Sequence, residues 1–268
     1  MKTTIRLLLL IFITGINSCG SEDDNSIVNS VANKKPKTIE YENRVFCSYS
    51  YTNDNKLSKI INYHSNNNIH TYDIYYSENE PTECVHTYTA DPDAGFVKVK
   101  FEKIASNKIL ATVVSSKNTN SIHLIILNDK GLPIKINDIE DGISIESEGY
   151  CVREFFYYPN TPIIRQIRMS NKYSTGSTYT YEYDNYPGMM CSINNPIWFM
   201  MYYKEMISGG NEFMCYVNNV AKVMYSYRSS SGTLYTDIAY DSQYTYDDDN
   251  FPISIAELIR DDYFTINY

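Results

Sequence analysis

The sequence of 268 residues lacks most of the short motifs that mark well-known catalytic sites. It has no Gly-x-Ser-x-Gly elbow, no phosphate-binding glycine loop, no dinucleotide fingerprint and no His-Glu-x-x-His pair. No Cys-x-x-Cys occurs either, which leaves zinc ribbons and dithiol redox sites without support. Acidic residues are plentiful, but the sequence singles out no pair of them for a glycosidase. We therefore expect no enzymatic activity, no cofactor and no metal site.

Histidine is scarce, and its four positions do not have zinc-site spacing. His64 and His70 flank a turn at 65–68 in an expected hairpin, so their side chains can face each other across two strands. A metal pair and ordinary polar residues on a sheet are both compatible with that arrangement, and the sequence favours the second. Two runs rich in aspartate, at 91–95 and 247–250, lack the glycine and bidentate glutamate of a calcium loop. They are expected to be turns, with adventitious calcium at 247–250 as the alternative.

Positive charge is also in short supply, with 23 Lys and Arg against 32 Asp and Glu. Removing residues 1–18 takes away two basic residues, Lys2 and Arg6, and no acidic one, so the remainder has a net charge of about −11. Nucleic-acid binding depends on lysine and arginine at the phosphates. The charge therefore argues against a nucleic-acid partner and against a basic membrane-binding patch.

The first residues have the pattern of a secretory signal peptide. The basic Lys2 and Arg6 precede an uncharged apolar run at 7–13. A membrane-spanning helix needs about 20 apolar residues, and this run ends near Gly15. We expect residues 1–18 to be a signal peptide rather than a membrane helix.

Cys19 is the first residue of the expected mature chain. Ile16 lies three positions before it and the small Ser18 directly before it, which resembles the lipobox of bacterial lipoproteins. The resemblance implies that the Cys19 thiol carries a diacylglyceryl group and that its amine is acylated. Because each buried methylene contributes roughly 0.8 kcal/mol, two or three chains would hold the protein on a membrane. The alternative is an ordinary signal peptide with a chance cysteine.

The acidic residues at 22–24 follow Cys19 at once. They resemble the export signal that directs lipoproteins of the Bacteroidota to the outer face of the outer membrane. The alternative is a solvated acidic tether that carries no address. Residues 19–37 as a whole are expected to be a lipidated flexible tether, and residues 38–268 a single β-rich domain, since no linker composition interrupts them.

The other cysteines are Cys47, Cys84, Cys151, Cys191 and Cys215. Five is an odd number, so at least one thiol stays free. The periplasm permits disulfides, and a bridge between Cys191 and Cys215 is one possibility. We expect most of the five to be small buried hydrophobic residues.

Tyrosine is the dominant residue type, with 27 Tyr against 10 Phe and 1 Trp. Tyrosine suits half-buried strands, because it has an apolar ring and a polar hydroxyl. A repeated pattern of alternating apolar residues, an Asn/Asp/Gly turn and a second alternating run predicts β-hairpins. It occurs at 49–60, 124–136 and 244–255, and in weaker form at 75–81 and 179–187. The sequence predicts an all-β antiparallel meander that forms a curved sheet or an open barrel.

These hairpins, together with the lipobox and a late Tyr-x-Tyr-x-Tyr-Asp segment, resemble a family of Bacteroidota lipoproteins with a domain of unknown function described as porin-like in fold. The corresponding stretches here are 49–60, 179–187 and 244–255, within a resemblance that covers most of residues 40–268. The shared motifs mark turns rather than chemistry, so the resemblance implies a fold and no catalytic residue. Because the expected strands carry polar residues on both faces, we predict that they do not cross a lipid bilayer.

One segment, at 196–207, is expected to be a short helix. Asn194 and Asn195 can cap it, Pro196 suits the first turn, and an apolar run to Ile207 follows before two glycines. The favoured interpretation is a helix that plugs one end or face of the sheet. The alternative is a ligand-binding lip. The candidate binding surface on which the second interpretation depends comprises Trp198, Tyr202, Tyr181 and Tyr183.

Three functions remain open from the sequence. A surface lipoprotein that binds a glycan or a protein without catalysis fits the expected location and the aromatic residues. A hydrolase of an extracellular polymer and a structural subunit of an outer-membrane complex are the alternatives. We predict the first, with membrane attachment through Cys19, a glycan or surface protein as partner, and a position on the exterior of the outer membrane.

Overall fold

A computed structural model describes residues 34–64, 68–89, 95–116, 120–139, 151–171, 174–208 and 216–268. The expected signal peptide, Cys19 and most of the tether lie outside these ranges. The described part contains sixteen strands and one helical segment. The strands are β1 (Thr38–Tyr41), β2 (Arg44–Tyr51), β3 (Leu57–Tyr63), β4 (Ile69–Ser77), β5 (Glu80–Tyr88), β6 (Phe96–Ala105), β7 (Lys108–Ser115), β8 (Asn120–Leu127), β9 (Pro133–Ile139), β10 (Cys151–Tyr157), β11 (Ile164–Asn171), β12 (Ser174–Pro187), β13 (Asn218–Arg228), β14 (Leu234–Tyr246), β15 (Pro252–Glu257) and β16 (Asp262–Asn267).

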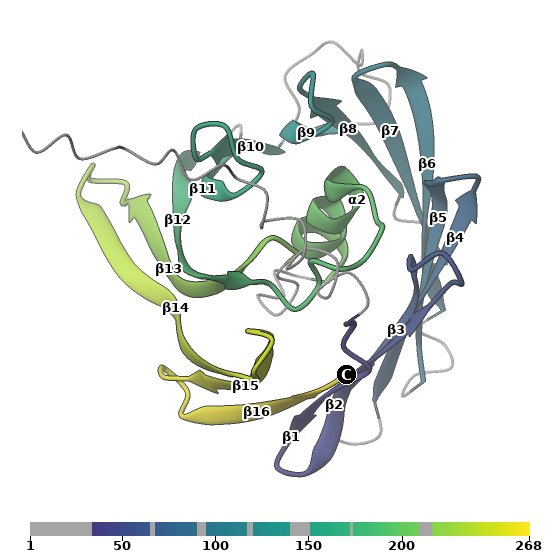
Figure 1. Ribbon diagram of the computed structural model, residues 1–268. Helices are drawn as coiled ribbons and strands as arrows, with labels where there is room; N and C mark the ends of the chain where they lie inside the picture. The colour runs from purple at the N-terminus through teal and green to yellow at the C-terminus, as the bar shows by residue number, and fades with distance from the viewer. Residues whose placement is uncertain are drawn as a thin grey trace, which may run out of the picture.

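The strands form a closed barrel in which each strand pairs with its neighbours in the chain (Figure 1). The last strand closes the ring by pairing with the first, from Thr38 opposite Asn267 to Tyr41 opposite Phe264. The predicted antiparallel meander is confirmed. Closure removes the sheet edges that an open arrangement leaves unpaired.

Most of the predicted hairpins are present, and their turns have the expected chemistry. In the turns of β2–β3 and β14–β15, Asn55 and Asn250 have positive φ of 64° and 63°, a conformation that asparagine tolerates. In the β8–β9 turn, Asn128 Oδ1 accepts hydrogen bonds from the N–H groups of Lys130 and Leu132. The Asx turn that Asp247 forms in β14–β15 is equivalent. These side-chain bonds fix the tight returns locally.

The predicted hairpin at 179–187 is wrong. That segment is part of β12, which runs unbroken to Pro187 with register shifts against β13 at 182–187. The carboxylate of Asp184 bonds to the N–H of Tyr186 and to the hydroxyl of Tyr246. Its bonds therefore hold a bulge against the neighbouring wall instead of closing a turn.

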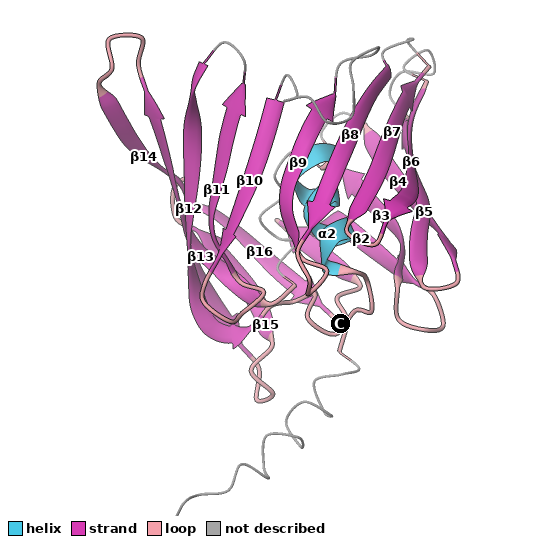
Figure 2. Ribbon diagram, turned by 90° about the horizontal axis from the view of Figure 1, so that it is seen from above, coloured by secondary structure: helices cyan, strands magenta, loops and turns pink. Residues whose placement is uncertain are grey.

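A helical plug fills part of the barrel (Figure 2). It consists of α2 (Ile197–Tyr202) and a π-helical continuation, η2 (Tyr203–Ile207), so the predicted helix at 196–207 is confirmed. The residues from Trp198 to Tyr203 are all buried. A helix that is apolar on every side belongs in an interior, and the ring of strands provides it.

The expected helix caps have a different role. Pro196 occupies the N-cap position, and no side chain of the described residues caps the helix. Asn195 Oδ1 instead accepts a hydrogen bond from the Leu57 N–H, and its amide donates to the Tyr76 hydroxyl. The amide of Asn194 donates to the carbonyl of Asp54. Both asparagines thus fasten the start of the plug to the β2–β3 turn.

The core lies between the plug and the inner face of the barrel. Phe101, from β6, meets the rings of Trp198, Phe199 and Tyr202 edge-on, at centroid distances of 5.5, 5.6 and 5.3 Å. Such edge-to-face pairs add about 0.5–1.5 kcal/mol each beyond the burial of apolar area. The aromatic side chains of the plug therefore set its position within the barrel.

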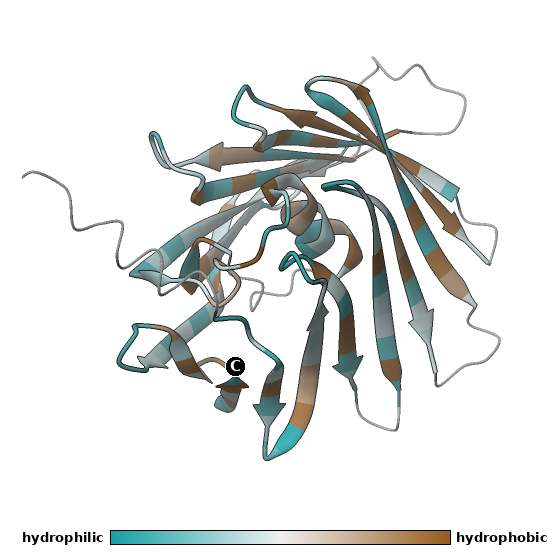
Figure 3. Cartoon of the chain, turned by 45° about the vertical axis from the view of Figure 1, so that its right-hand side comes forward, coloured by the Kyte–Doolittle hydropathy of each residue, from teal (hydrophilic) through white to brown (hydrophobic). Residues whose placement is uncertain are grey.

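Hydrophilic and hydrophobic residues alternate along many of the strands (Figure 3), and the outward face of the barrel carries charged pairs at mid-strand. Lys59 of β3 and Asp73 of β4 form an ion pair at 3.0 Å, in the middle of their strands. Lys98 pairs with Glu83 at 3.1 Å on the next hairpin. The face that would meet lipid in a membrane barrel is apolar, whereas here ion pairs share the outward face with exposed apolar side chains such as Tyr75 and Tyr263. In the described part of the chain, no helix is long and apolar enough to cross a membrane.

The described cysteines, Cys47, Cys84, Cys151 and Cys191, are free thiols. Cys47 and Cys84 are 1% exposed and belong to the core, as expected of small hydrophobic residues. Cys215 lies outside the described residues.

Candidate functional site

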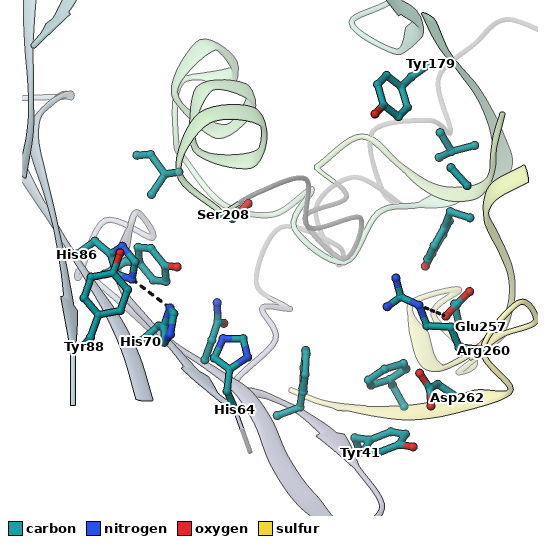
Figure 4. A pocket seen from close by; sticks show the side chains of 18 residues that line it. Tyr41, His64, His70, His86, Tyr88, Tyr179, Ser208, Glu257, Arg260 and Asp262 are labelled. Atoms are coloured by element: carbon teal, nitrogen blue, oxygen red, sulfur yellow. Dashed lines mark hydrogen bonds and ion pairs between the residues drawn. The ribbon is translucent and has the colours of Figure 1, made fainter. Parts of the chain in front are cut away.

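The barrel contains a chamber beside the end of the plug, with a volume of about 710 Å³ (Figure 4). Sites for small molecules commonly have volumes of 300–1,000 Å³. One wall comes from β1 to β5 and the other from β12 to β16, and Ile207 and Ser208 of the plug form the base between them. The ring-bearing side chains of the lining are Tyr41, Phe46, His64, His70, Tyr72, His86, Tyr88, Tyr179, Tyr240 and Phe264.

Three histidines follow one another across the first wall. The rings of His64 and His70 lie 4.4 Å apart between centroids, so the expected facing of these two side chains across the hairpin is confirmed. His86 Nε2 lies within hydrogen-bond distance of His70 Nδ1, at 3.2 Å. Strand alternation places His70 of β4 and His86 of β5 on the inward face, which brings them together although 16 residues separate them in the chain.

Two tyrosines complete this wall. Tyr72 stacks on His86 at 4.1 Å and 16°, and the ring of Tyr88 also lies 4.1 Å from His86. We name His64, His70, His86, Tyr72 and Tyr88 the histidine wall. Its rings present flat apolar faces to the chamber, and its imidazoles supply donors and acceptors at their edges.

Two imidazoles of this wall, those of His70 and His86, are held neutral near pH 7. Burial, followed by the proximity of His70 and His64, lowers the pKa of His86 to about 4 from its ordinary value of 6.5. Burial and His64 lower the pKa of His70 as well. A neutral imidazole both donates and accepts, so the wall suits a ligand that carries hydroxyl groups rather than one that carries a negative charge.

The opposite wall carries charge. Glu257 of β15 and Asp262 of β16 are direct partners across their strands, and both line the chamber. Arg260 Nε lies 3.6 Å from a carboxylate oxygen of Glu257. The Tyr41 hydroxyl donates to Asp262, and that hydrogen bond raises the pKa of the Tyr41 phenol. We name Glu257, Arg260, Asp262 and Tyr41 the acidic wall.

The candidate surface expected from the sequence is not on the surface. Trp198, Tyr202 and Tyr181 are 5%, 0% and 2% exposed, and Tyr183 is half-buried beside Tyr181. They pack between the plug and the barrel wall, because an all-apolar helix must be covered on every side. Burial contradicts an exposed lip at Trp198, Tyr202 and Tyr181, whereas Tyr183 is only half-buried; the helix forms the expected plug. Cys19 lies outside the described residues, so lipidation there stays a prediction.

A second polar cluster fastens the plug rather than facing the chamber. His123 Nδ1 lies 2.6 Å from the hydroxyl of the buried Tyr202, and the Ser121 hydroxyl lies 3.3 Å from His123 Nε2. Asp138 stands 3.7 Å from the same nitrogen. Burial, with Arg153 nearby, lowers the pKa of His123 to about 4. Tyr202 and Asp138 act on opposite nitrogens of the ring, and the cluster ties α2 to β8 and β9.

Within the described ranges, no three His, Cys, Asp or Glu side chains converge in a way that could hold a metal ion. In the acidic turn at 247–250, the carboxylate of Asp247 accepts hydrogen bonds from backbone N–H groups of the turn and contacts Lys34. The other aspartate-rich run, at 91–95, lies almost wholly outside the described residues.

Sequence reasoning identified the facing of His64 and His70 but missed the rest of the chamber. His86 and Tyr88 alternate on β5 as a His-x-Tyr pair, and the same alternation joins His70 to Tyr72 on β4. That shared pattern is a signal that could have linked the two strands. No local sequence pattern identifies Glu257 and Asp262 as chamber residues, because only closure of the barrel brings them opposite the histidine wall.

The fold and site define a closed antiparallel barrel with an internal plug and an open internal chamber. No family model matches the chain, and no curated protein matches it. Among solved structures, one match is a porin-like protein from Bacteroides uniformis ATCC 8492, with 13% identity and a TM-score of 0.39, covering 87% of this chain and 96% of that one. Another is a porin-like protein from Bacteroides vulgatus ATCC 8482, with 9% identity and a TM-score of 0.36, covering 88% and 99%. Membership of the lipoprotein family stays a prediction.

Proposed function

We propose that this protein is a lipid-anchored, non-catalytic binding protein that takes a carbohydrate into the chamber of its barrel. The observation that carries the proposal is the lining of the chamber, where ring faces alternate with neutral imidazoles, phenols and carboxylates. Aromatic faces stack on the apolar faces of sugar rings, and the polar groups accept or donate to their hydroxyls. A site of this kind is concave, mostly apolar and supplied with a few polar groups.

Binding without catalysis agrees with how the carboxylates are engaged. Arg260 is an ion-pair partner of Glu257, and Tyr41 donates to Asp262. A glycosidase needs one carboxyl that gives a proton and a second that attacks or activates water. Each of the two carboxyl groups here already has a partner from the chain. A hydrolase is nevertheless testable, because release of reducing ends from bound oligosaccharides would contradict the proposal.

The test is a printed array of linear neutral oligosaccharides probed with the full chain, followed by calorimetric titration of the tightest binder. We expect binding that Tyr88→Ala weakens by roughly threefold to tenfold, since one stacking ring contributes about 0.5–1.5 kcal/mol. Tyr75→Ala is the matched control, because Tyr75 is 52% exposed and lies on the outward face of β4. Retention of no oligosaccharide, or equal weakening by both variants, would exclude the chamber as a carbohydrate site.

We also propose that the barrel is held at the outer membrane, on its exterior, by lipid on Cys19 and not by insertion of its strands. The ion pairs on the outward face, such as Lys59 with Asp73 and Glu154 with Arg168, support this proposal. Lysine or arginine at the middle of a lipid-facing wall costs about 2–4 kcal/mol, and an acidic side chain costs less. Protease digestion of intact cells tests the orientation: degradation of the protein is expected, and full protection would contradict an exterior position.

A further inference from the structure

The hairpin of β13 and β14 extends beyond β15, the short strand that pairs with β14. β13 and β14 form the tallest part of the side of the barrel on which they lie (Figure 2). β15 pairs with β14 only from Ser242 to Tyr246, and the N–H of Leu258 reaches the carbonyl of Asp241. Above that point, residues 234–240 have β13 as their ladder partner among the described strands. Residues Leu234–Ala239 are exposed, so the inner face of this wall is open to solvent.

Four tyrosines follow one another along that inner face. The centroid distance is 4.9 Å between Tyr179 and Tyr225, 5.5 Å between Tyr225 and Tyr227, and 5.3 Å between Tyr227 and Tyr235. The last two pairs are nearly parallel, at 26° and 17°. We name Tyr179, Tyr225, Tyr227 and Tyr235 the tyrosine track. Tyr235 at its outer end is 47% exposed.

Register places the whole track on the face that points into the barrel. Tyr225 and Tyr227 continue the inward alternation of the buried Val223, and Tyr179 continues that of the buried Tyr181. Tyr235 is the direct partner of Tyr227. At its inner end the track joins the chamber, because Tyr179 is one of the lining residues and points toward the cavity in Figure 4. The track therefore runs without interruption from the rim into the chamber.

Polar groups accompany the rings. Asp237 is the partner of Tyr225 across the strands, and Ser177 is the partner of Tyr227. An acyl chain would leave these groups and the tyrosine hydroxyls without partners. An anionic polymer would meet a carboxylate beside the rings, on a protein whose net charge is −9. A neutral carbohydrate chain suits both features, since its ring faces stack on tyrosine and its hydroxyls bond to the polar groups.

We propose that the ligand is a linear neutral glycan that lies along the tyrosine track with its end in the chamber. This inference rests on the proposed function, because the chamber must hold a sugar for the track to extend it. The track adds binding contacts for each further sugar unit outside the chamber. Affinity therefore rises with the length of the glycan until the track is filled.

The experiment measures affinity against chain length with the full protein. The probe is the tightest-binding linear oligosaccharide type from the array, prepared as a series from the monosaccharide to the hexasaccharide. We expect the hexasaccharide to bind at least tenfold more tightly than the monosaccharide. Tyr235→Ala and Tyr227→Ala should each remove roughly threefold to tenfold of that gain and leave monosaccharide binding unchanged. Tyr235 lies on a solvent-exposed hairpin, so Tyr235→Ala is the variant that disturbs folding less.

Tyr263→Ala is the matched control, because Tyr263 is 58% exposed and lies on the outward face of β16. It should leave the whole series unchanged. Equal affinities along the series, or a length-dependent gain that the two track variants do not reduce, would overturn the inference while leaving the chamber as a site. Failure of every saccharide to bind would overturn the proposed function itself, so the two failures are distinguishable.

Discussion

Buried hydroxyl groups in the plug differ in whether they have a partner. Tyr202 and Tyr203 are adjacent and fully buried. The hydroxyl of Tyr202 bonds to His123, whereas that of Tyr203 has no hydrogen-bond partner within the described residues. A buried polar group that loses its partner costs more than a well-made hydrogen bond gains. The Tyr202 hydroxyl is therefore expected to stabilise the fold, and the Tyr203 hydroxyl to destabilise it.

The first prediction is the effect of removing each hydroxyl. Tyr202→Phe leaves a nitrogen of His123 unpaired and is expected to lower the free energy of unfolding by about 1–3 kcal/mol. Tyr203→Phe removes an unsatisfied oxygen and is expected to be neutral or stabilising. Urea titration followed by circular dichroism measures both. Equal losses from the two variants would contradict the proposed contact between Tyr202 and His123.

The second prediction concerns pH. The pKa values of His86 and His123 are about 4 in the folded protein, below the ordinary value of 6.5. As the pH falls below 6.5, the unfolded chain takes up protons that the folded chain refuses, so stability decreases until about pH 4. Between pH 6.5 and 5 each histidine is expected to cost about 1–2 kcal/mol. The carboxylate of Asp54, with a pKa lowered to about 2 chiefly by its bond to Lys56, contributes only at lower pH.

Urea titrations at pH 7 and pH 5 measure this effect. In the double variant His86→Gln, His123→Gln, most of the difference between the two pH values should disappear, whatever its stability at pH 7. A wild-type protein that is equally stable at both pH values would show that these imidazoles are not held neutral by burial.

At the scale of secondary-structure elements, the plug depends on its fastening to the barrel. α2 is only six residues long, and isolated helices of that length are unstable in water. Asn195 bonds to both Leu57 and Tyr76, at 2.8 and 2.7 Å, whereas Asn194 makes its side-chain bond at an exposed position. The position of the plug therefore depends more on Asn195 than on its neighbour.

The third prediction follows from this asymmetry. Asn195→Ala should destabilise the protein by about 1–3 kcal/mol, because it leaves the Leu57 N–H without its acceptor. It should also increase amide hydrogen exchange in residues 199–208. Asn194→Ala is the control and should have a smaller effect on both measurements. Unchanged exchange in the plug of the Asn195 variant would mean that packing alone positions the helix.

Elements formed by local chemistry were predictable from the sequence. The turns at Asn55, Asn128 and Asp247 carry their own hydrogen bonds and positive φ, so pattern reading located them. The segment at 184–186 has the same residue types but bonds to Tyr246, which is 62 residues away. Residues typical of a turn can form a bulge instead when a side chain from a distant strand bonds to them. The local sequence does not show such a partner.

At the scale of the whole molecule, the chamber is a consequence of closure. The pairing of β1 with β16 brings Asp262 and Glu257 to face the histidines of β4 and β5 across the interior. No sequence period encodes that pairing, so the sequence predicted a curved sheet or open barrel and placed the aromatic surface on the wrong residues. It did predict the antiparallel hairpins and the helical plug. Those features depend on alternation and composition, which are local.

The fourth prediction concerns attachment of the whole molecule. Because charged pairs lie at mid-strand on the outward face, the barrel should not remain in the membrane without lipid on Cys19. Cys19→Ala should move the protein from the membrane fraction to the soluble fraction of cells that express it, which immunoblotting of the two fractions measures. Persistence of the variant in carbonate-washed membranes would contradict the assignment of the anchor to Cys19.

The central claim is that the chamber between the histidine wall and the acidic wall binds a sugar. Its most direct test is a crystal structure of the full chain with the tightest-binding oligosaccharide. We predict electron density for a sugar ring in the chamber, stacked on Tyr88 or His70 and with hydroxyls bonded to Asp262 or Glu257. Density for the sugar on the outward face of the barrel, with the chamber unchanged, would contradict the claim.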